Sequence, residues 1–396
     1  MAALSFADAR QTVIDKVRAS LPPPKTESIR LAEAAGRILA QPIHADRDYP
    51  PQPRSMRDGF AVRAADLPGT LELIGEVRAG QPTHLTLAPG QAIEIMTGAT
   101  VPPGADSVVM IEHTTAQGAL ITIGRALEPG ANINPQGCDA AAGALLLRPG
   151  HRIGYPEQAL LASVGAAYVT VYLRPRVAIL ATGDELVEVD GHPSPHQIRN
   201  SNSWSLAHQV VRAGGEAIIL PIAPDRLDAT MELIHDGLQS NLLLLSGGVS
   251  AGKYDLVENA LRHVNAHFFF DRVLIQPGQP CVFGEAAGTF FFGLPGNPAS
   301  TMVCFEVFAR AALELLGGAA APTLNFTLAP LAAPFHHKPG LTRFLPASLL
   351  PDGTLTPLKW SGSGDIAAIT RANCYLVAAP ERPEYSAGEL IQVLPL

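Results

Sequence analysis

Three mostly apolar runs in the middle of the chain predict buried β-strands. They are Arg176–Ala181, Leu242–Ser246 and Thr289–Leu294. Continuous apolar runs of this length, bounded by glycine or polar turns, are typical of parallel strands that are covered on both faces. Segments with helical spacing lie between them. We therefore expect a doubly wound α/β domain from about residue 174 to residue 318.

Each predicted strand leads into a polar loop that contains glycine. These loops begin with Thr182-Gly183-Asp184-Glu185, Ser246-Gly247-Gly248 and Pro295-Gly296-Asn297. Ligands of such sheets bind beyond the carboxyl ends of the strands, and glycine lets backbone N–H groups approach an anion. The third loop opens a predicted helix at residues 299–316, whose first N–H groups are free. Together the loops predict a phosphate site, although each alone is also compatible with an ordinary tight turn.

Acidic residues in two of these loops are candidate metal ligands. Asp184 and Glu185 follow the first strand, and Asp255 lies a few residues beyond the second. Mg²⁺ takes oxygen ligands, usually one or two carboxylates together with substrate phosphates. Adjacent acids in a turn are more often simply solvated. Three similar loops in one domain favour the functional interpretation.

The flanking regions show other patterns. Helical spacing occurs at residues 6–19, 30–39 and 156–164, and short β-type runs between 49 and 150 are separated by Pro and Gly turns. Short strands return after residue 319. We expect an α/β multidomain fold with an N-terminal helical and β-module region at 1–173 (β module at about 49–150), a doubly wound domain at 174–318 and a C-terminal β-barrel at 319–396.

Composition narrows the class of protein. The chain has 396 residues, of which 47% are hydrophobic and 16% charged, so a large core and little disorder are expected. The net charge of −8 and the absence of a Lys or Arg run argue against nucleic-acid binding. No signal peptide or membrane-length apolar run is present, and we expect a cytoplasmic protein. Four widely spaced cysteines predict neither disulfides nor a zinc site.

Short motifs along the whole chain carry a family resemblance. They are Ser55-Met-Arg-Asp-Gly-Phe-Ala61, Ile95-Met-Thr-Gly-Ala99, Gly130-Ala-Asn-Ile133, Gly137-Cys-Asp139, Thr182-Gly-Asp-Glu185, Ser201-Asn202, Asp225, Ser246-Gly-Gly-Val-Ser250, Asp255, Gly293-Leu-Pro-Gly-Asn-Pro298, Ser361-Gly-Ser-Gly364 and Arg371-Ala-Asn373. In this order they closely resemble the MoeA family of molybdopterin molybdenumtransferases, which is also represented by the E domain of gephyrin.

The resemblance implies a transferase of molybdenum cofactor biosynthesis. Such an enzyme takes adenylylated molybdopterin, inserts molybdenum from molybdate at the dithiolene and releases AMP with the help of Mg²⁺. The central domain would be MogA-like and bind molybdopterin. The resemblance also implies a homodimer with an inter-subunit active site, and as partners a MogA-type adenylyltransferase and downstream molybdoenzymes.

The same resemblance assigns expected roles to individual residues. The expected catalytic residues are Asp58, Asp139, Glu185 and Asp255, and the expected metal ligands are Asp184, Glu185 and Asp255. The expected substrate-binding residues are Thr182, Gly183, Asn202, Asp225, Ser246, Gly247, Gly248, Ser250, Gln276, Gln279, Pro295, Gly296, Asn297, Arg343 and Ser363. The glycine loops would cradle the pterin phosphate and the AMP moiety, and the acids would hold Mg²⁺ against the phosphoanhydride.

Several positions depart from the family pattern. Gln276 and Gln279 stand where the family commonly has lysines, and the usual arginine positions in the 340–346 segment are Leu341 and Pro346. Arg343 is a candidate source of the missing charge, or a surface residue. These departures leave open a working transferase with a changed anion site, a variant tuned for tungstate, and a catalytically impaired scaffold or delivery protein. A nucleotide-binding domain of another pathway would require the terminal motifs to match by accident.

Overall fold

The computed structural model describes residues 2–20, 24–248 and 256–396. The chain forms two compact units. The first contains Met1–Ala40, Pro149–Gly154 and Val169–Leu396, and the second contains Gln41–Arg148 and Tyr155–Tyr168. The chain therefore passes between the units four times.

A six-stranded sheet forms the centre of the first unit. Its order is β16 (Glu216–Ile219), β13 (Arg176–Ala181), β17 (Leu242–Ser246), β21 (Thr289–Leu294), β20 (Val282–Ala286) and β18 (His267–Phe270). The first four strands are parallel to their neighbours, whereas β20 and β18 pair antiparallel. All five residues of β17 are buried. The three predicted strands are therefore confirmed, and their carboxyl ends lie at one edge of the sheet.

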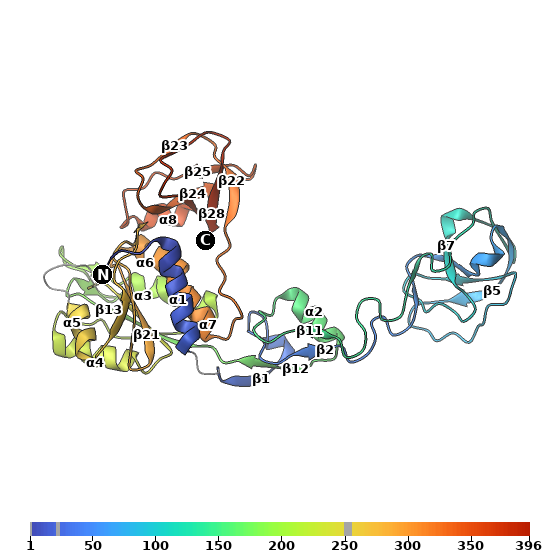
Figure 1. Ribbon diagram of the computed structural model, residues 1–396, viewed down its shortest axis with the longest axis horizontal. Coiled ribbons are helices and arrows are strands. Elements are labelled where there is room, and N and C mark those ends of the chain that lie inside the picture. Colours follow the sequence, from blue (N-terminus) through green and yellow to red (C-terminus); the bar gives the residue numbers. More distant parts are fainter. Residues whose placement is uncertain (1, 21–23, 249–255) are drawn as a thin grey trace. The chain divides into compact units, whose positions relative to one another are not determined.

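Helices cover both faces of this sheet (Figure 1). One face carries α1 (Phe6–Ser20), α3 (Asn202–Ala213), and a continuous helical stretch made of α6 (Pro298–Cys304), a π-helical segment (Phe305–Ala309) and α7 (Arg310–Leu316). The other face carries α4 (Leu227–Gly237) and α5 (Leu256–His263). Along β13, Val177 and Ile179 join the first core while Ala178 and Leu180 join the second. This alternation explains why the strand sequence is apolar throughout.

The C-terminal part of the first unit is built on a second sheet. Its order is β19 (Ile275–Gln276), β24 (Thr342–Leu349), β26 (Cys374–Ala378), β28 (Leu390–Pro395) and β22 (Thr327–Pro330), with β25 (Leu355–Pro357) also paired to β24. Beside it are the β23–β27 ladder (Phe335–His336 with Glu384–Tyr385) and α8 (Ile366–Arg371). Because β19 comes from the central region of the sequence, the loop that follows it is attached to the C-terminal sheet.

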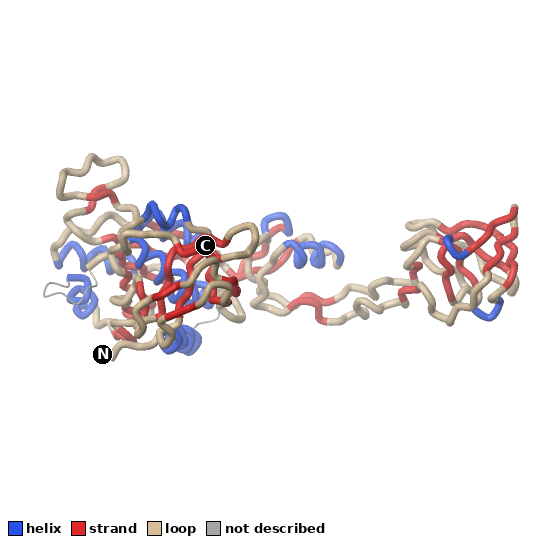
Figure 2. Tube along the Cα trace, turned by 90° about the horizontal axis from the view of Figure 1, so that it is seen from above, coloured by secondary structure: helices blue, strands red, loops and turns tan. Residues whose placement is uncertain are grey.

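The second unit is mainly strands and loops (Figure 2). Its six-stranded sheet has the order β7 (Ser107–Met110), β4 (Gly59–Val62), β6 (Gln91–Ile95), β5 (Gly69–Val77), β9 (Leu120–Ile123) and β8 (Thr114–Gln117). Two short ladders, β3–β10 (Arg54–Ser55 with Ile133–Asn134) and β2–β11 (Ile43–His44 with Leu145–Leu147), and helix α2 (Tyr155–Ser163) complete it. Nowhere in the described residues is there a helix of the length and apolarity needed to cross a membrane.

One predicted helix is wrong. Residues 30–39 show helical spacing, but the structure has the end of β1 (Thr26–Arg30), a single 3₁₀ turn (Leu31–Glu33) and then extended chain. Gly36 adopts a left-handed conformation with φ of 74°, which ends helical propagation. The backbone N–H of Leu39 donates to the carbonyl of His151 at 2.8 Å. Pairing with a distant segment has overridden the local pattern.

Candidate functional site

A pocket of about 640 Å³ lies at the carboxyl ends of β13, β17 and β21. All three predicted loops contribute to its lining. Residues of β14 (Leu186–Val187), β15 (Ile198–Arg199), the start of α3 and the segment around α8 also line it. The lining residues that the sequence had indicated are Thr182, Glu185, Asn202, Ser246, Gly247, Gly296 and Asn297.

The loops fit together closely because they contain glycine. A Cβ atom on Gly247 would lie 2.9 Å from the carbonyl oxygen of Thr182, and one on Gly248 would lie 2.9 Å from the Thr182 hydroxyl oxygen. Both glycines have φ in the left-handed region, at 93° and 63°. A Cβ atom on Gly296 would lie 3.5 Å from the Cα of Gly247. Any larger residue at 247 or 248 would push the first two loops apart.

Asn202 ties the first turn of α3 to two of these loops. Its Nδ2 donates to the Ser246 hydroxyl at 2.9 Å and to the Gly296 carbonyl at 2.8 Å. Because a carbonyl can only accept, the second bond fixes the orientation of the amide. The Oδ1 atom is buried and has no hydrogen-bond partner among the described residues. Through its amide nitrogen, Asn202 thus connects the loops at Ser246 and Gly296, which both line the pocket.

The adjacent acidic residues Asp184 and Glu185 lie in different surroundings. The Glu185 carboxylate lies over Gly183, since a Cβ there would meet Glu185 Oε2 at 2.2 Å, and it lines the pocket. Asp184 does not line it, and its Oδ1 accepts the backbone N–H of Asp225 at 3.0 Å. Asp255 and Ser250 lie outside the described residues. Among the residues that are described, no group of three or more His, Cys, Asp or Glu side chains comes together.

The two glutamines of the altered loop do not line this pocket. Gln276 lies in β19, in register with Arg343 of β24. Arg343 Nη1 donates to the Gln276 side-chain oxygen, and its Nε donates to the carbonyl of Lys338 at 3.1 Å. Gln279 is exposed. The guanidinium of Arg343 therefore brings a positive charge to the position of the missing lysine.

The other substrate-binding residues expected in the first unit lie at the start of α6 or beside the Glu185 loop. The Ser363 carbonyl accepts the N–H of Ala299 at 2.9 Å, and the Pro295 carbonyl accepts the Thr301 hydroxyl, so both positions support the start of α6. Gly183 and Asp225 adjoin the Glu185 loop as described above.

Asp58 and Asp139 belong to the second unit. Asp58 Oδ1 accepts the backbone N–H of Thr97 at 2.7 Å, and this hydrogen bond lowers the pKa of the exposed Asp58 carboxyl. The Cys138 thiol donates to Asp139 Oδ1 at 3.6 Å. Desolvation, and then the Asp139 charge, raise the pKa of the Cys138 thiol. A thiol of raised pKa is a weak nucleophile near neutral pH.

Arg199 lines the pocket and was not indicated by the sequence. It lies in β15, where it pairs with Val187 of β14. The only local signal is its place immediately before Asn200-Ser201-Asn202, the segment that begins α3. An exposed arginine in a short strand has no periodicity that would distinguish it from other surface arginines.

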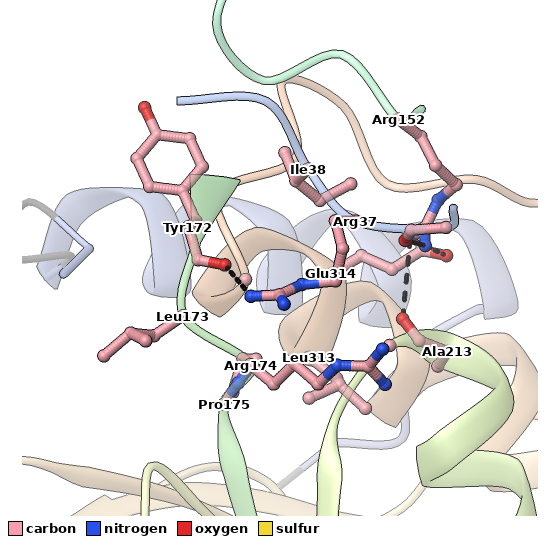
Figure 3. Close-up of a pocket in the computed structure, with 13 residues that line it drawn as sticks. Arg37, Ile38, Arg152, Tyr172, Leu173, Arg174, Pro175, Ala213, Leu313 and Glu314 are labelled. Atoms are coloured by element: carbon pink, nitrogen blue, oxygen red, sulfur yellow. Dashed lines mark hydrogen bonds and ion pairs between the residues drawn. The ribbon is translucent and has the colours of Figure 1, made fainter. Parts of the chain in front are cut away.

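A smaller pocket is lined by three arginines but offers little room (Figure 3). Arg37, Arg152 and Arg174 surround a volume of about 20 Å³, which is close to that of one water molecule. Arg37 donates to the carbonyl of Tyr172 at 2.9 Å. Arg152 lies 3.6 Å from the buried Glu314 carboxylate. Arg37 and Arg152 are engaged with carbonyls and carboxylates of the protein, so this pocket is a structural junction.

Comparison with known proteins gives matches along the whole chain. The model of the MoeA N-terminal region (domain I and II) matches residues 4–165, that of the probable molybdopterin binding domain residues 178–315, and that of the MoeA C-terminal region (domain IV) residues 328–396. Proteins named molybdopterin molybdenumtransferase are similar in sequence. That of Staphylococcus epidermidis is 33% identical over 381 residues, covering 93% of this chain and 91% of its own length. That of Bacillus subtilis is 34% identical over 385 residues, covering 93% and 90%.

A solved structure of similar fold supports the same family. The molybdopterin biosynthesis MoeA protein of Pyrococcus horikoshii OT3 is 28% identical, matches with a TM-score of 0.81 and covers all of both chains. The three matching regions follow one another in the same order as the sequence motifs. From its N-terminal motifs to its C-terminal sheet, this chain belongs to the MoeA family.

Proposed function

We propose that this protein is a molybdopterin molybdenumtransferase, which inserts molybdenum from molybdate into adenylylated molybdopterin and releases AMP. One observation carries the proposal: three glycine loops at the ends of parallel strands meet around a 640 Å³ pocket in a chain of the MoeA family. A pocket of this size accommodates a nucleotide or a pterin. Its glycine loops suit the phosphate groups of such a substrate.

The residues of the pocket have distinct proposed tasks. Backbone N–H groups of the loop at 296 would face the phosphates, since Gly296 has no Cβ to obstruct their approach. The N–H of Gly247 instead donates to the carbonyl of Leu294 at 3.2 Å. Asn202 keeps these two loops at a fixed separation. The Glu185 carboxylate, which lines the pocket, is an oxygen ligand of the type that Mg²⁺ accepts together with waters and substrate phosphates. Bound Mg²⁺ would stabilise negative charge on the AMP phosphate as it leaves.

The proposal also covers the setting in which the protein works. As the family resemblance implies, we propose a cytoplasmic homodimer that receives its substrate from a MogA-type adenylyltransferase and serves downstream molybdoenzymes. Sedimentation of the purified protein at micromolar concentration tests the dimer directly.

Release of AMP is the decisive assay. Purified protein would be incubated with adenylylated molybdopterin in Mg²⁺, with molybdate, with tungstate and with neither oxyanion. We expect AMP release to be stimulated by molybdate. Stimulation by tungstate alone would identify a variant tuned for that oxyanion. Binding of the adenylylated pterin without any release would overturn the transferase assignment.

A scaffold or delivery protein is the second candidate function. The observation that favours it is the replacement of two cationic side chains by Gln276 and Gln279. A neutral hydrogen bond contributes about 1 kcal/mol, whereas one to a charged group contributes about 1.5–3 kcal/mol, so oxyanion binding at this loop would be weaker. Arg343, which bonds to Gln276, supplies a compensating charge and favours the enzyme.

Restoring the lysines tests the role of this loop. We expect Gln276→Lys combined with Gln279→Lys to tighten molybdate binding by about tenfold, because charged donors replace neutral ones. Calorimetric titration with molybdate measures the effect. Gln276→Asn with Gln279→Asn is the neutral control and should bind no more tightly than the original protein. An unchanged molybdate affinity in the lysine variant would show that neither position contacts the oxyanion.

A further inference from the structure

Arg199 brings a cationic side chain to the large pocket. Among the described residues that line it, Arg199 and Glu185 are the only two with charged side chains. Arg199 lies in β15, lines the pocket together with residues of the glycine loops, and is exposed to solvent. Of the described lining residues, only Arg199 would therefore offer a positive side chain to a substrate with phosphate groups.

The guanidinium of Arg199 is held at one end and free at the other. Its Nε donates to the carbonyl of Gly191 at 3.1 Å, within the loop that joins β14 to β15. In the described part of the chain no carboxylate forms an ion pair with it, and neither Nη atom has a hydrogen-bond acceptor. Four N–H donors remain on the two Nη atoms. Other arginines of the first unit differ, since Arg343, Arg226 and Arg212 donate to side chains of the protein.

A guanidinium held in this way is suited to a phosphate. Fixing Nε reduces the rotamer freedom that binding would otherwise remove, and the two Nη atoms form a planar fork that matches two oxygens of one phosphate group. The net charge of the protein is −8, so no general positive field draws an anion to the pocket. Local donors have to supply the attraction.

We propose that Arg199 binds a phosphate group of the substrate and so selects phosphorylated ligands for this pocket. The inference rests on the proposed function, because it takes the pocket as the substrate site. It adds a residue and a substrate feature: a phosphate ester contacted by the Nη atoms of Arg199.

The test compares a phosphorylated ligand with its uncharged analogue. AMP and adenosine would be titrated into the full-length protein, into Arg199→Gln and into Arg199→Lys, at 50 and 200 mM salt (about a twofold change in Debye length). We expect Arg199→Gln to weaken AMP binding by about 10- to 100-fold and to leave adenosine binding unchanged. AMP binding to the variant should also depend less on salt. Arg199→Lys should retain part of the affinity, since it keeps the charge but not the fork.

Arg176→Gln is the matched control. Arg176 is an exposed arginine at the amino end of β13, about 16 Å along the strand from the pocket. The Arg176→Gln variant should bind AMP and adenosine with the same affinities as the original protein. If AMP and adenosine affinity fall together in Arg199→Gln, then Arg199 only positions the β14–β15 loop and the inference is overturned.

The outcomes also separate this inference from the proposed function. Molybdate-stimulated AMP release with an unchanged KM in Arg199→Gln would remove Arg199 and leave the transferase intact. A protein that binds neither AMP nor adenylylated molybdopterin and releases no AMP would overturn both.

Discussion

Replacing Glu185 with glutamine should lower kcat/KM for AMP release by about 10²- to 10⁴-fold, which is the range for loss of a positioned acid, base or metal-binding group. Glu185 is the one carboxylate that lines the large pocket in the described residues. Its carboxylate lies against the Gly183 backbone, at the end of the buried strand β13. Glutamine has nearly the same shape but carries no charge. The substitution therefore removes the negative charge of residue 185 and preserves its packing.

Single-turnover measurements at several Mg²⁺ concentrations would test this prediction. Glu188→Gln is the control, because Glu188 belongs to the same loop, is exposed and does not line the pocket. If Glu185 holds the metal, a higher Mg²⁺ concentration should restore part of the activity of Glu185→Gln. Equal activity of the two variants would remove Glu185 from the mechanism.

The largest effect on stability is expected for Glu314→Ala. Glu314 lies in α7 with a side-chain exposure of 1%. Its Oε1 lies 3.0 Å from Arg310 Nε and 3.6 Å from Arg152 Nη2, and its Oε2 accepts the backbone N–H of Thr323 at 2.6 Å. Figure 3 shows Glu314 beside Arg152 at the junction between α3 and α7. Without Glu314, Arg310 keeps only the Glu306 carboxylate at 3.0 Å, and Arg152 loses its ion-pair partner. Removing one member of a buried ion pair costs about 3–5 kcal/mol.

Urea unfolding followed by tryptophan fluorescence measures this cost. Both tryptophans of the chain, Trp204 and Trp360, lie in the first unit, so the signal reports the unit that contains Glu314. Asp228→Ala is the control. It removes an exposed ion pair with Arg226 and should change the free energy of unfolding by less than about 1 kcal/mol. A similar small change for Glu314→Ala would show that water replaces the lost carboxylate.

Much of the doubly wound region could be predicted because its signals are local. A strand that is buried on both faces needs apolar residues at every position, so β17 could be identified from Leu242 to Leu245 without its neighbours. Glycine at the strand ends indicated loops with unusual backbone conformations, and Gly247 and Gly248 have them. The local pattern predicted a helix wrongly at residues 30–39, where backbone hydrogen bonds to residues near 151 replace it.

The amino-acid sequence by itself determined the strands, their glycine loops and the family, because each depends on residues that are adjacent or in a set order. The tertiary structure decided which side chains meet. Arg199 enters the pocket because β15 pairs with β14, and Arg343 reaches Gln276 because β24 pairs with β19. Glu314 is stabilised by Arg152, which lies 162 residues earlier in the sequence. Such contacts depend on strand register and on helix packing, which local patterns do not encode.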